Sequence, residues 1–179
     1  MDHKMRKTEW IVITGAPCSG KTSVVSGLEL RGHRVVHEAA RAYIDELLTS
    51  GKSLQEIKAD PLTFERTILY RKLAIEANLP ENETIFLDRG IPDSIAYFLS
   101  AGLDTSEPME ISRGVRYRKV FHFQRLWFQN DHVRAEDERM AKDLDKLLKQ
   151  SYEMLGYRVI HIPVLTVEQR VDFILEQLQ

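Results

Sequence analysis

The sequence predicts an α/β fold in which a five-stranded parallel sheet is covered by helices on both faces. Short apolar runs rich in β-branched residues recur along the chain, and longer stretches with helical periodicity separate them. Runs that are apolar throughout are typical of parallel strands buried on both faces, and their alternation with helices indicates right-handed crossovers. A glycine-containing loop joins the first run to the first helix, as in many nucleotide-binding folds.

The whole-chain properties limit the classes of protein to consider. A length of 179 residues is typical of one domain, and we expect a single domain over residues 1–179. The net charge of -2 gives no general attraction to nucleic acid, and no apolar run approaches the ~20 residues that cross a bilayer. Because the polar N-terminus leaves no room for a signal-peptide core, we expect a cytoplasmic protein without nucleic-acid or membrane partners. The sequence leaves a homo-oligomer open.

The first elements follow one another closely. Residues 10–14, WIVIT, predict the first strand, and a helix over 22–31 ends at Gly32, because glycine readily adopts the left-handed conformation found after helices. The apolar pair within residues 34–37 predicts the second strand. A helical pattern then covers residues 39–50.

The middle of the chain contains the longest crossover. Residues 51–60 are polar, and Pro61 suits the first turn of a helix over 61–78. The apolar residues 84–87 predict the third strand, and a helix is expected over 91–102.

The C-terminal part supplies two more strands. KVFHF at 119–123 predicts the fourth strand, and the segment 125–139, which is basic, aromatic and acidic by turns, indicates a loop or lid. A helix over 135–155 and a strand over 158–162 follow. A capping box then begins the final helix, expected over 166–178.

The loop after the first strand matches G-x-x-x-x-G-K-[ST] at Gly15, Gly20, Lys21 and Thr22, and residues 15–22 are called the phosphate loop below. Glycine lets backbone N–H groups approach an anion, and the following helix N-terminus favours negative charge. A plain strand-to-helix turn is the alternative interpretation. The fold class predicted is therefore an α/β P-loop NTPase that binds ATP, with GTP also possible, and Mg²⁺. Nucleotide contacts are expected from Gly15, Ala16, Pro17, Cys18, Ser19, Gly20, Lys21, Thr22 and Ser23.

Asp88 ends the third apolar run, and Arg89 follows it directly. A carboxylate there would orient Mg²⁺ together with the Thr22 hydroxyl, while Lys21 would contact the β- and γ-phosphates. Arg89 could hold the acceptor or the transferred phosphoryl group in a bidentate grip. The alternatives are a helix-capping Asp88 and a surface ion pair for Arg89.

Glu38 follows the second strand, with Arg41 three residues later on the same helical face. Glu38 is expected to accept a proton or a hydrogen bond from an acceptor hydroxyl, and Arg41 to balance charge. An ordinary i,i+3 ion pair between the two is the alternative. If an acceptor binds here, a cavity should run from Lys21 and Thr22 past Glu38 and Arg41 to Arg89, lined in part by the helix that starts at Pro61.

The lid segment contains arginines that could close over the phosphates. Arg134 is the main candidate, and Arg125 and Arg139 are weaker ones, because solvated arginines among acidic residues are also common.

Four stretches together carry a resemblance: GAPCSGKTS, HEAAR, FLDRGIPDSIAYF and NDHVRAEDER. They resemble the small AAA-type P-loop ATPase and kinase domains related to the ribosylnicotinamide kinase domain of NadR-type proteins, and more loosely thymidylate and deoxynucleoside kinases. The resemblance implies a nucleoside-kinase-like fold with an Arg-bearing lid, an Arg89 that bridges donor and acceptor, and a Glu38 similar to the base of deoxynucleoside kinases. The chain departs from thymidylate kinases at Gly90 and Asp93, where those enzymes have an aromatic and a small hydroxyl residue.

Two functions follow from these observations. The first is a phosphotransferase that moves the γ-phosphoryl group of ATP to a small-molecule, nucleoside- or nucleotide-like acceptor. The second is an ATP- or GTP-hydrolysing switch that acts on a macromolecular partner, with water as the acceptor.

Overall fold

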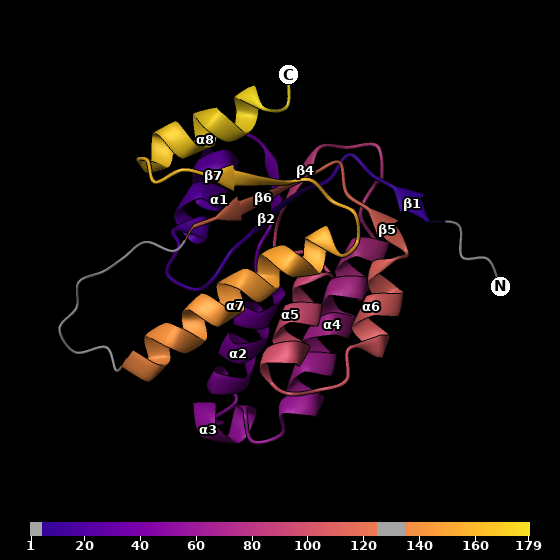
Figure 1. The fold of residues 1–179 in the computed structure, drawn as a ribbon, viewed down its shortest axis with the longest axis vertical. Coiled ribbons are helices and arrows are strands. Elements are labelled where there is room, and N and C mark those ends of the chain that lie inside the picture. The colour runs from indigo at the N-terminus through magenta and orange to yellow at the C-terminus, as the bar shows by residue number, and fades with distance from the viewer. Residues whose placement is uncertain (1–4, 125–134) are drawn as a thin grey trace.

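A computed structural model describes residues 5–124 and 135–179, and its main sheet has five parallel strands in the order β3-β4-β2-β6-β7 (Figure 1). All five expected strands are present, each within one residue of its expected bounds, and the predicted fold class is confirmed. The strands are β2 (Ile11–Thr14), β3 (Arg34–Val36), β4 (Ile85–Asp88), β6 (Lys119–Phe123) and β7 (Val159–Ile162).

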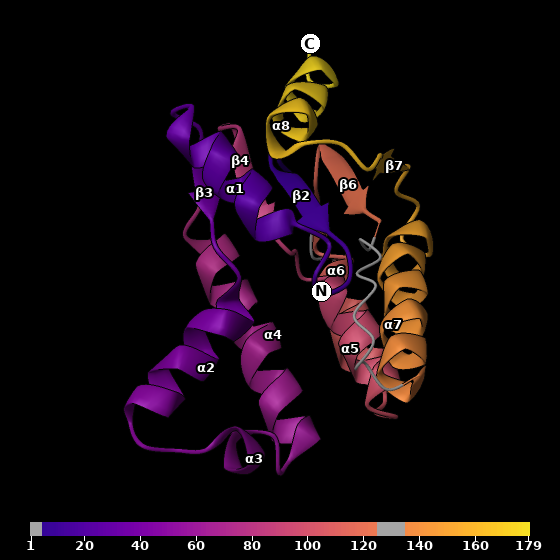
Figure 2. The ribbon, with the colours of Figure 1, turned by 90° about the vertical axis from the view of Figure 1, so that its left-hand side faces the viewer.

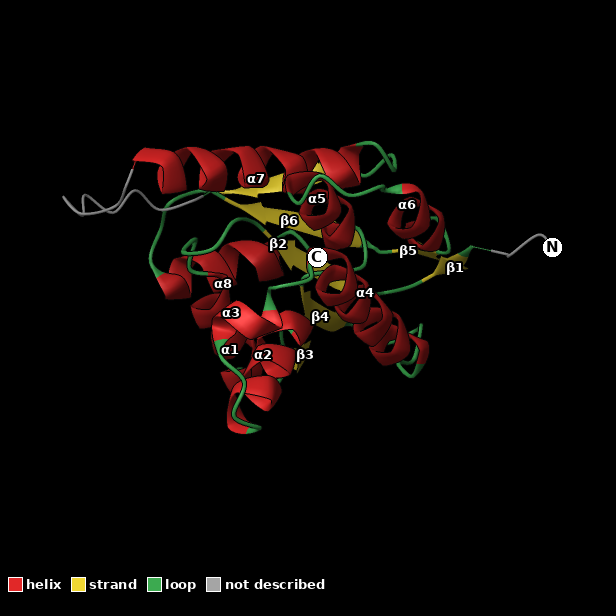
Figure 3. Ribbon diagram, turned by 90° about the horizontal axis from the view of Figure 1, so that it is seen from below, coloured by secondary structure: helices red, strands yellow, loops and turns green. Residues whose placement is uncertain are grey.

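Helices cover both faces of this sheet, as Figures 1 and 3 show. One face packs against α1 (Lys21–Leu30) and α8 (Val167–Glu176). The other packs against α4 (Pro61–Ala77), α5 (Asp93–Ser100) and α7 (Ala135–Glu153). The sheet is therefore buried on both sides, which explains why its strands are apolar throughout.

The central strand β2 shows this two-sided burial residue by residue. Ile11 and Ile13 belong to the apolar cluster under α1 and α8, whereas Val12 belongs to the cluster under α4, α5 and α7. All three side chains are fully buried. Burying a side chain of this size stabilises the fold by roughly 1.5–3 kcal/mol, so the strand is fixed in position from both faces.

A group of helices that follows β3 projects away from the sheet. Figure 2 shows α2 (Ala39–Thr49), α3 (Leu54–Ile57) and the first part of α4 lying together on this side. Contacts of α2 with both α3 and α4 hold the group together. Helices α2 and α4, with Lys58 just after α3, line one side of the cavity described below.

Four short elements were not expected from the sequence. Strand β1 (Arg6–Lys7) pairs in parallel with β5 (Val115–Arg116) in a small second sheet. Helix α3 lies within the segment treated as polar connection, and α6 (Ser106–Ser112) follows α5. Helix α3 has a signal in the sequence, because Ser53 and Glu56 form a capping box. No helix in the described part of the chain has the length and apolar character needed to span a membrane.

Candidate active site at the carboxyl edge of the sheet

The phosphate loop connects β2 to α1 at the carboxyl edge of the sheet, where ligands bind in folds of this kind. Gly15 has a φ of 139°, and a Cβ there would lie 2.5 Å from the carbonyl oxygen of Phe123. Gly20, the residue before α1, has a φ of 84°. Both positions therefore require glycine. Cys18 adopts a φ of 62° without being glycine, a conformation that costs roughly 1–2 kcal/mol.

Lys21 is the first residue of α1, and its side chain is buried across the phosphate loop. The ammonium donates hydrogen bonds to the carbonyl oxygen of Ala16 at 2.8 Å and to the hydroxyl of Ser19 at 3.2 Å. Burial lowers the pKa of Lys21 to about 8, and the positive charge of Arg89 acts in the same direction. An anion bound in the loop would offset this cost of burying the ammonium.

Two side chains that the sequence analysis did not single out hold the phosphate loop from outside. Asp145 of α7 accepts a hydrogen bond from the backbone N–H of Ala16 at 3.0 Å. Arg170 of α8 donates to the carbonyl oxygen of Ser19 at 3.0 Å. Each lies far along the chain from the loop, and neither stands in a recognisable motif, so only the fold reveals the contacts.

Asp88 occupies the last position of β4, beside Ile13 of β2, and only 4% of the residue is exposed. Its Oδ1 atom has no hydrogen-bond partner within the described residues. Burial raises the pKa of Asp88 to about 6, and the nearby charge of Glu38 adds to the effect. An unpaired buried carboxylate oxygen beside Lys21 fits a ligand for Mg²⁺ or for a metal-bound water.

Arg89 connects two carboxylates that lie on different elements. Its Nε donates to Glu38 Oε1 at 2.9 Å, and its Nη1 donates to Asp93 Oδ1 at 3.1 Å. Only 3% of the Arg89 side chain is exposed, so this is not a surface ion pair. The expected alternative for Glu38, a pair with Arg41 one turn later, is not what the structure contains, because Glu38 pairs with Arg89 instead.

Asp93 is fully buried at the start of α5 and was not assigned a role from the sequence. It accepts hydrogen bonds from the Thr14 hydroxyl at 2.6 Å, from the Gly90 N–H at 3.0 Å and from the Tyr152 hydroxyl. Burial alone would raise the pKa of Asp93, but Lys72, Arg89 and these hydrogen bonds hold it below its usual value. Asp93 is therefore a charged anchor for the turn that carries Arg89.

Gly90 explains one departure from the thymidylate kinase pattern. A Cβ at this position would lie 2.9 Å from the Tyr152 hydroxyl oxygen and 3.1 Å from that of Tyr117. These hydroxyls accept hydrogen bonds from the backbone N–H groups of Gly90 and Ile91, at 3.2 and 3.1 Å. The two tyrosines occupy the space that an aromatic residue at position 90 would need.

Lys72 of α4 supports the same turn from the cavity side. Its buried ammonium donates to the carbonyl oxygen of Gly90 at 3.1 Å and to the Ser94 hydroxyl at 3.2 Å. Burial lowers the pKa of Lys72, although nearby carboxylates, Asp93 foremost, oppose the shift. A lysine within a helical stretch gives no sign in the sequence that its side chain is buried, which is why Lys72 was missed.

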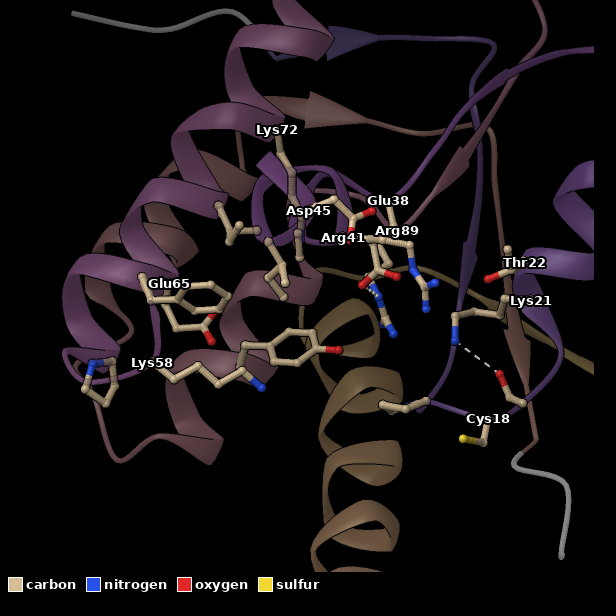
Figure 4. A pocket seen from close by; sticks show the side chains of 18 of the residues that line it. Cys18, Lys21, Thr22, Glu38, Arg41, Asp45, Lys58, Glu65, Lys72 and Arg89 are labelled. Atoms are coloured by element: carbon tan, nitrogen blue, oxygen red, sulfur yellow. Dashed lines mark hydrogen bonds and ion pairs between the residues drawn. The ribbon is translucent and has the colours of Figure 1, made fainter. Parts of the chain in front are cut away.

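A cavity of about 830 Å³ joins the phosphate loop to Glu38, Arg89 and Lys72 and follows the course expected from the sequence. In Figure 4, Lys21 and Thr22 lie at one end and Lys58 and Glu65 at the other, with Arg89 between them. A volume of this size accommodates a drug-sized ligand. The cavity is lined by Pro17, Cys18, Ser19, Gly20, Lys21, Thr22, Glu38, Ala40, Arg41, Ile44, Asp45, Lys58, Pro61, Phe64, Glu65, Ile68, Lys72, Arg89 and Tyr97.

The predicted lid cannot be placed in this site. Arg134 and Arg125 lie outside the residues that the structure describes. Arg139, the third arginine considered, is an exposed residue of α7.

The phosphate loop at the carboxyl edge of this parallel sheet defines a P-loop α/β protein. A family model described as an AAA domain matches residues 10–170, and the chain belongs to that family. No curated protein matches the chain in sequence.

Solved structures share the fold at low sequence identity. Thymidylate kinase from Ehrlichia chaffeensis aligns with a TM-score of 0.66 at 15% identity, covering 97% of this chain and 99% of the kinase. NadR in complex with NR aligns with a TM-score of 0.71 at 13% identity, covering 94% of this chain and 50% of NadR. Deoxyadenosine kinase from M. mycoides aligns with a TM-score of 0.64 at 16% identity, covering 94% and 98%. The expected similarity of fold to these three groups is confirmed.

Proposed function

We propose that this protein is a phosphotransferase that moves the γ-phosphoryl group of ATP to a hydroxyl of a small, nucleoside- or nucleotide-like acceptor. The observation that carries the proposal is the cavity that joins the phosphate loop to the Glu38–Arg89 pair. A switch that hydrolyses nucleotide needs no such space for a second ligand. Thymidylate kinase and deoxyadenosine kinase, which share the fold, act on acceptors of this kind.

On the donor side, the phosphate loop and Ser23 would bind the nucleotide, with Lys21 contacting the β- and γ-phosphates. Thr22 and Asp88 would hold Mg²⁺, which when bound supplies positive charge to the phosphates. GTP could replace ATP, because the loop contacts phosphate rather than base. We place the reaction in the cytoplasm, as the sequence suggests.

On the acceptor side, the proton of the attacking hydroxyl would pass to Glu38. The new bond forms between the acceptor oxygen and the γ-phosphorus, while the bond to the β-phosphate oxygen breaks and ADP leaves. Arg89 would lie against the transferred group, and Arg41 would balance charge beside it. The hydrogen bond from Arg89 Nε to Glu38 Oε1 at 2.9 Å would orient the carboxylate for this proton transfer.

Transfer from γ-labelled ATP to a panel of nucleosides, nucleotides and pyridine ribosides tests the proposal. With the wild type, label should move to at least one acceptor. With Lys21→Ala or Glu38→Gln protein, label should not move, even where the variant binds the acceptor as tightly as the wild type. If label is released only as inorganic phosphate, and no compound binds the nucleotide-loaded protein, the hydrolytic switch is the better description.

A further inference from the structure

Glu65 lies on α4 at the end of the cavity away from the phosphate loop (Figure 4). The residue is half-buried, and no hydrogen bond or ion pair joins its carboxylate to another of the residues that the structure describes. Burial raises the pKa of Glu65, although the charges of Lys72 and Lys58 oppose the shift. A partly buried carboxylate without a partner is costly, so this group suits a ligand.

The other charged groups deep in the cavity already have partners. Arg89 is bound to Glu38 and Asp93. The Lys72 ammonium is bound to a carbonyl oxygen and a hydroxyl of the same region. Glu65 therefore differs from them in facing the cavity with its hydrogen-bonding capacity unused.

Aromatic and apolar side chains line the same cavity as this carboxylate. Phe64 is held by Tyr43 of α2, with ring centroids 6.1 Å apart. Tyr97 of α5 lies under the Arg89 guanidinium, whose Cζ is 5.4 Å from the ring centroid. Ile44 and Ile68 add aliphatic surface to the cavity wall. Flat apolar walls beside one polar group are typical of sites that bind a ring and recognise its edge.

We propose that the acceptor carries a flat ring whose edge bears N–H donors or a positive charge, and that Glu65 binds this edge. The inference rests on the proposed function, because it assumes that the acceptor hydroxyl lies at Glu38. Glu65 would also reject a ring that presents only lone pairs, since these would face the carboxylate. Glu65 is thus a specificity-determining residue.

Pairs of ligands that differ by one donor or one charge test this role. Adenosine is compared with purine riboside, guanosine with inosine, and nicotinamide riboside with its uncharged reduced form, each with Mg²⁺ and a non-hydrolysable ATP analogue. Calorimetry should find the first member of at least one pair bound about 10- to 100-fold more tightly, the range for a hydrogen bond to a charged group.

Variants at Glu65 assign that difference to the carboxylate. Glu65→Ala should abolish the preference within the pair while leaving affinity for the ATP analogue unchanged. Glu65→Gln should keep most of a preference for N–H donors, because the amide oxygen still accepts, and should lose a preference for positive charge. Glu110→Gln, an exposed residue of α6 with the same change of charge, is the matched control and should behave as wild type.

The outcomes separate this inference from the proposed function. If some compounds bind but their preference survives in Glu65→Ala protein, the role of Glu65 is wrong and the acceptor site stands. If compounds bind to the wild type but neither member of any pair is preferred, the role of Glu65 is again wrong and the acceptor site again stands. If nothing binds to the nucleotide-loaded protein, both the acceptor site and the role of Glu65 are overturned.

Discussion

The Nε of Arg89 donates a hydrogen bond to Glu38 Oε1 at 2.9 Å and so joins the turn after β4 to the start of α2. The two residues are 51 positions apart in the chain. Arg89 also pairs with Asp93, whereas Glu38 has Arg89 as its partner, so loss of Arg89 would leave the Glu38 carboxylate without that ion pair. The pair lies midway along the cavity, where donor and acceptor would meet.

Glu38→Gln should reduce phosphoryl transfer by about 10²- to 10⁴-fold, the usual effect of losing a general base. Affinity for ATP should stay nearly unchanged, because the phosphate loop is untouched. Single-turnover transfer and nucleotide titration measure the two effects separately. Full activity of Glu38→Gln would show that another group is the general base.

Lys21→Ala should weaken binding of Mg-nucleotide by about 10²-fold, since hydrogen bonds to charged groups contribute roughly 1.5–3 kcal/mol each. The fold should remain intact, because the ammonium bonds only to the loop itself. Calorimetry together with circular dichroism checks both points. Tight binding by a well-folded variant would contradict the phosphate-loop assignment.

Nucleotide binding should also take up protons near pH 8. Burial lowers the pKa of Lys21 to about 8 in the free protein, so part of the ammonium is deprotonated there. Bound phosphate favours the protonated form and raises this pKa, so affinity should fall as the pH rises through about 8. Calorimetry in buffers of different ionisation enthalpy counts the protons. Uptake that persists in Lys21→Ala would assign it to another group.

Asp88→Asn should raise the stability of the protein while it lowers the activity. The pKa of Asp88 is raised to about 6 in the folded protein, so the fold holds this proton more tightly than the unfolded chain does. The free energy of unfolding therefore increases as the pH falls through about 6 and Asp88 takes up its proton. At pH 7.5 the charged carboxylate destabilises the fold. Removing the charge should stabilise the metal-free protein by about 1–3 kcal/mol.

The same Asp88→Asn variant should lose Mg²⁺-dependent transfer with only a modest loss of nucleotide affinity. Urea unfolding without metal and transfer assays at limiting Mg²⁺ provide the two measurements. Wild-type activity under limiting Mg²⁺ would show that Asp88 has no role at the metal.

Gly90→Ala should destabilise the protein by about 1–3 kcal/mol, because its Cβ would lie 2.9 Å from the Tyr152 hydroxyl oxygen. Tyr152→Phe removes that oxygen, and the Gly90 N–H loses an acceptor. In the Tyr152→Phe background the alanine should cost less, since the nearest obstacle is gone. A double-mutant cycle by denaturant unfolding measures this coupling. Additive effects would mean that the turn moves freely.

The main sheet could be predicted because each of its strands has a local sequence pattern of its own. Continuous apolar runs such as residues 10–14 and 84–87 favour strands buried on both faces, and their alternation with helices indicates a parallel sheet. The short helix α6 has no comparable periodic pattern, and it contains Pro108. Helix α3 had a usable signal in its capping box, which the polar character of its surroundings obscured.

The candidate site was only partly predictable. The phosphate loop is a local motif, and the strand-end positions of Glu38 and Asp88 follow from the order of the elements. The partners of Asp93 and Lys72 depend instead on how α4, α5 and α7 pack. The bond between Asp93 and Tyr152 joins residues 59 positions apart, and no spacing rule relates them.

The two tyrosine hydroxyls over Gly90 also restrict how this family can diverge. A side chain at position 90 is disfavoured while Tyr117 and Tyr152 both remain, because it would meet both hydroxyls, which serve as hydrogen-bond acceptors for the turn. We therefore expect relatives with a larger residue at position 90 to have replaced at least one of the tyrosines. Positions 90, 117 and 152 are therefore expected to change together during evolution.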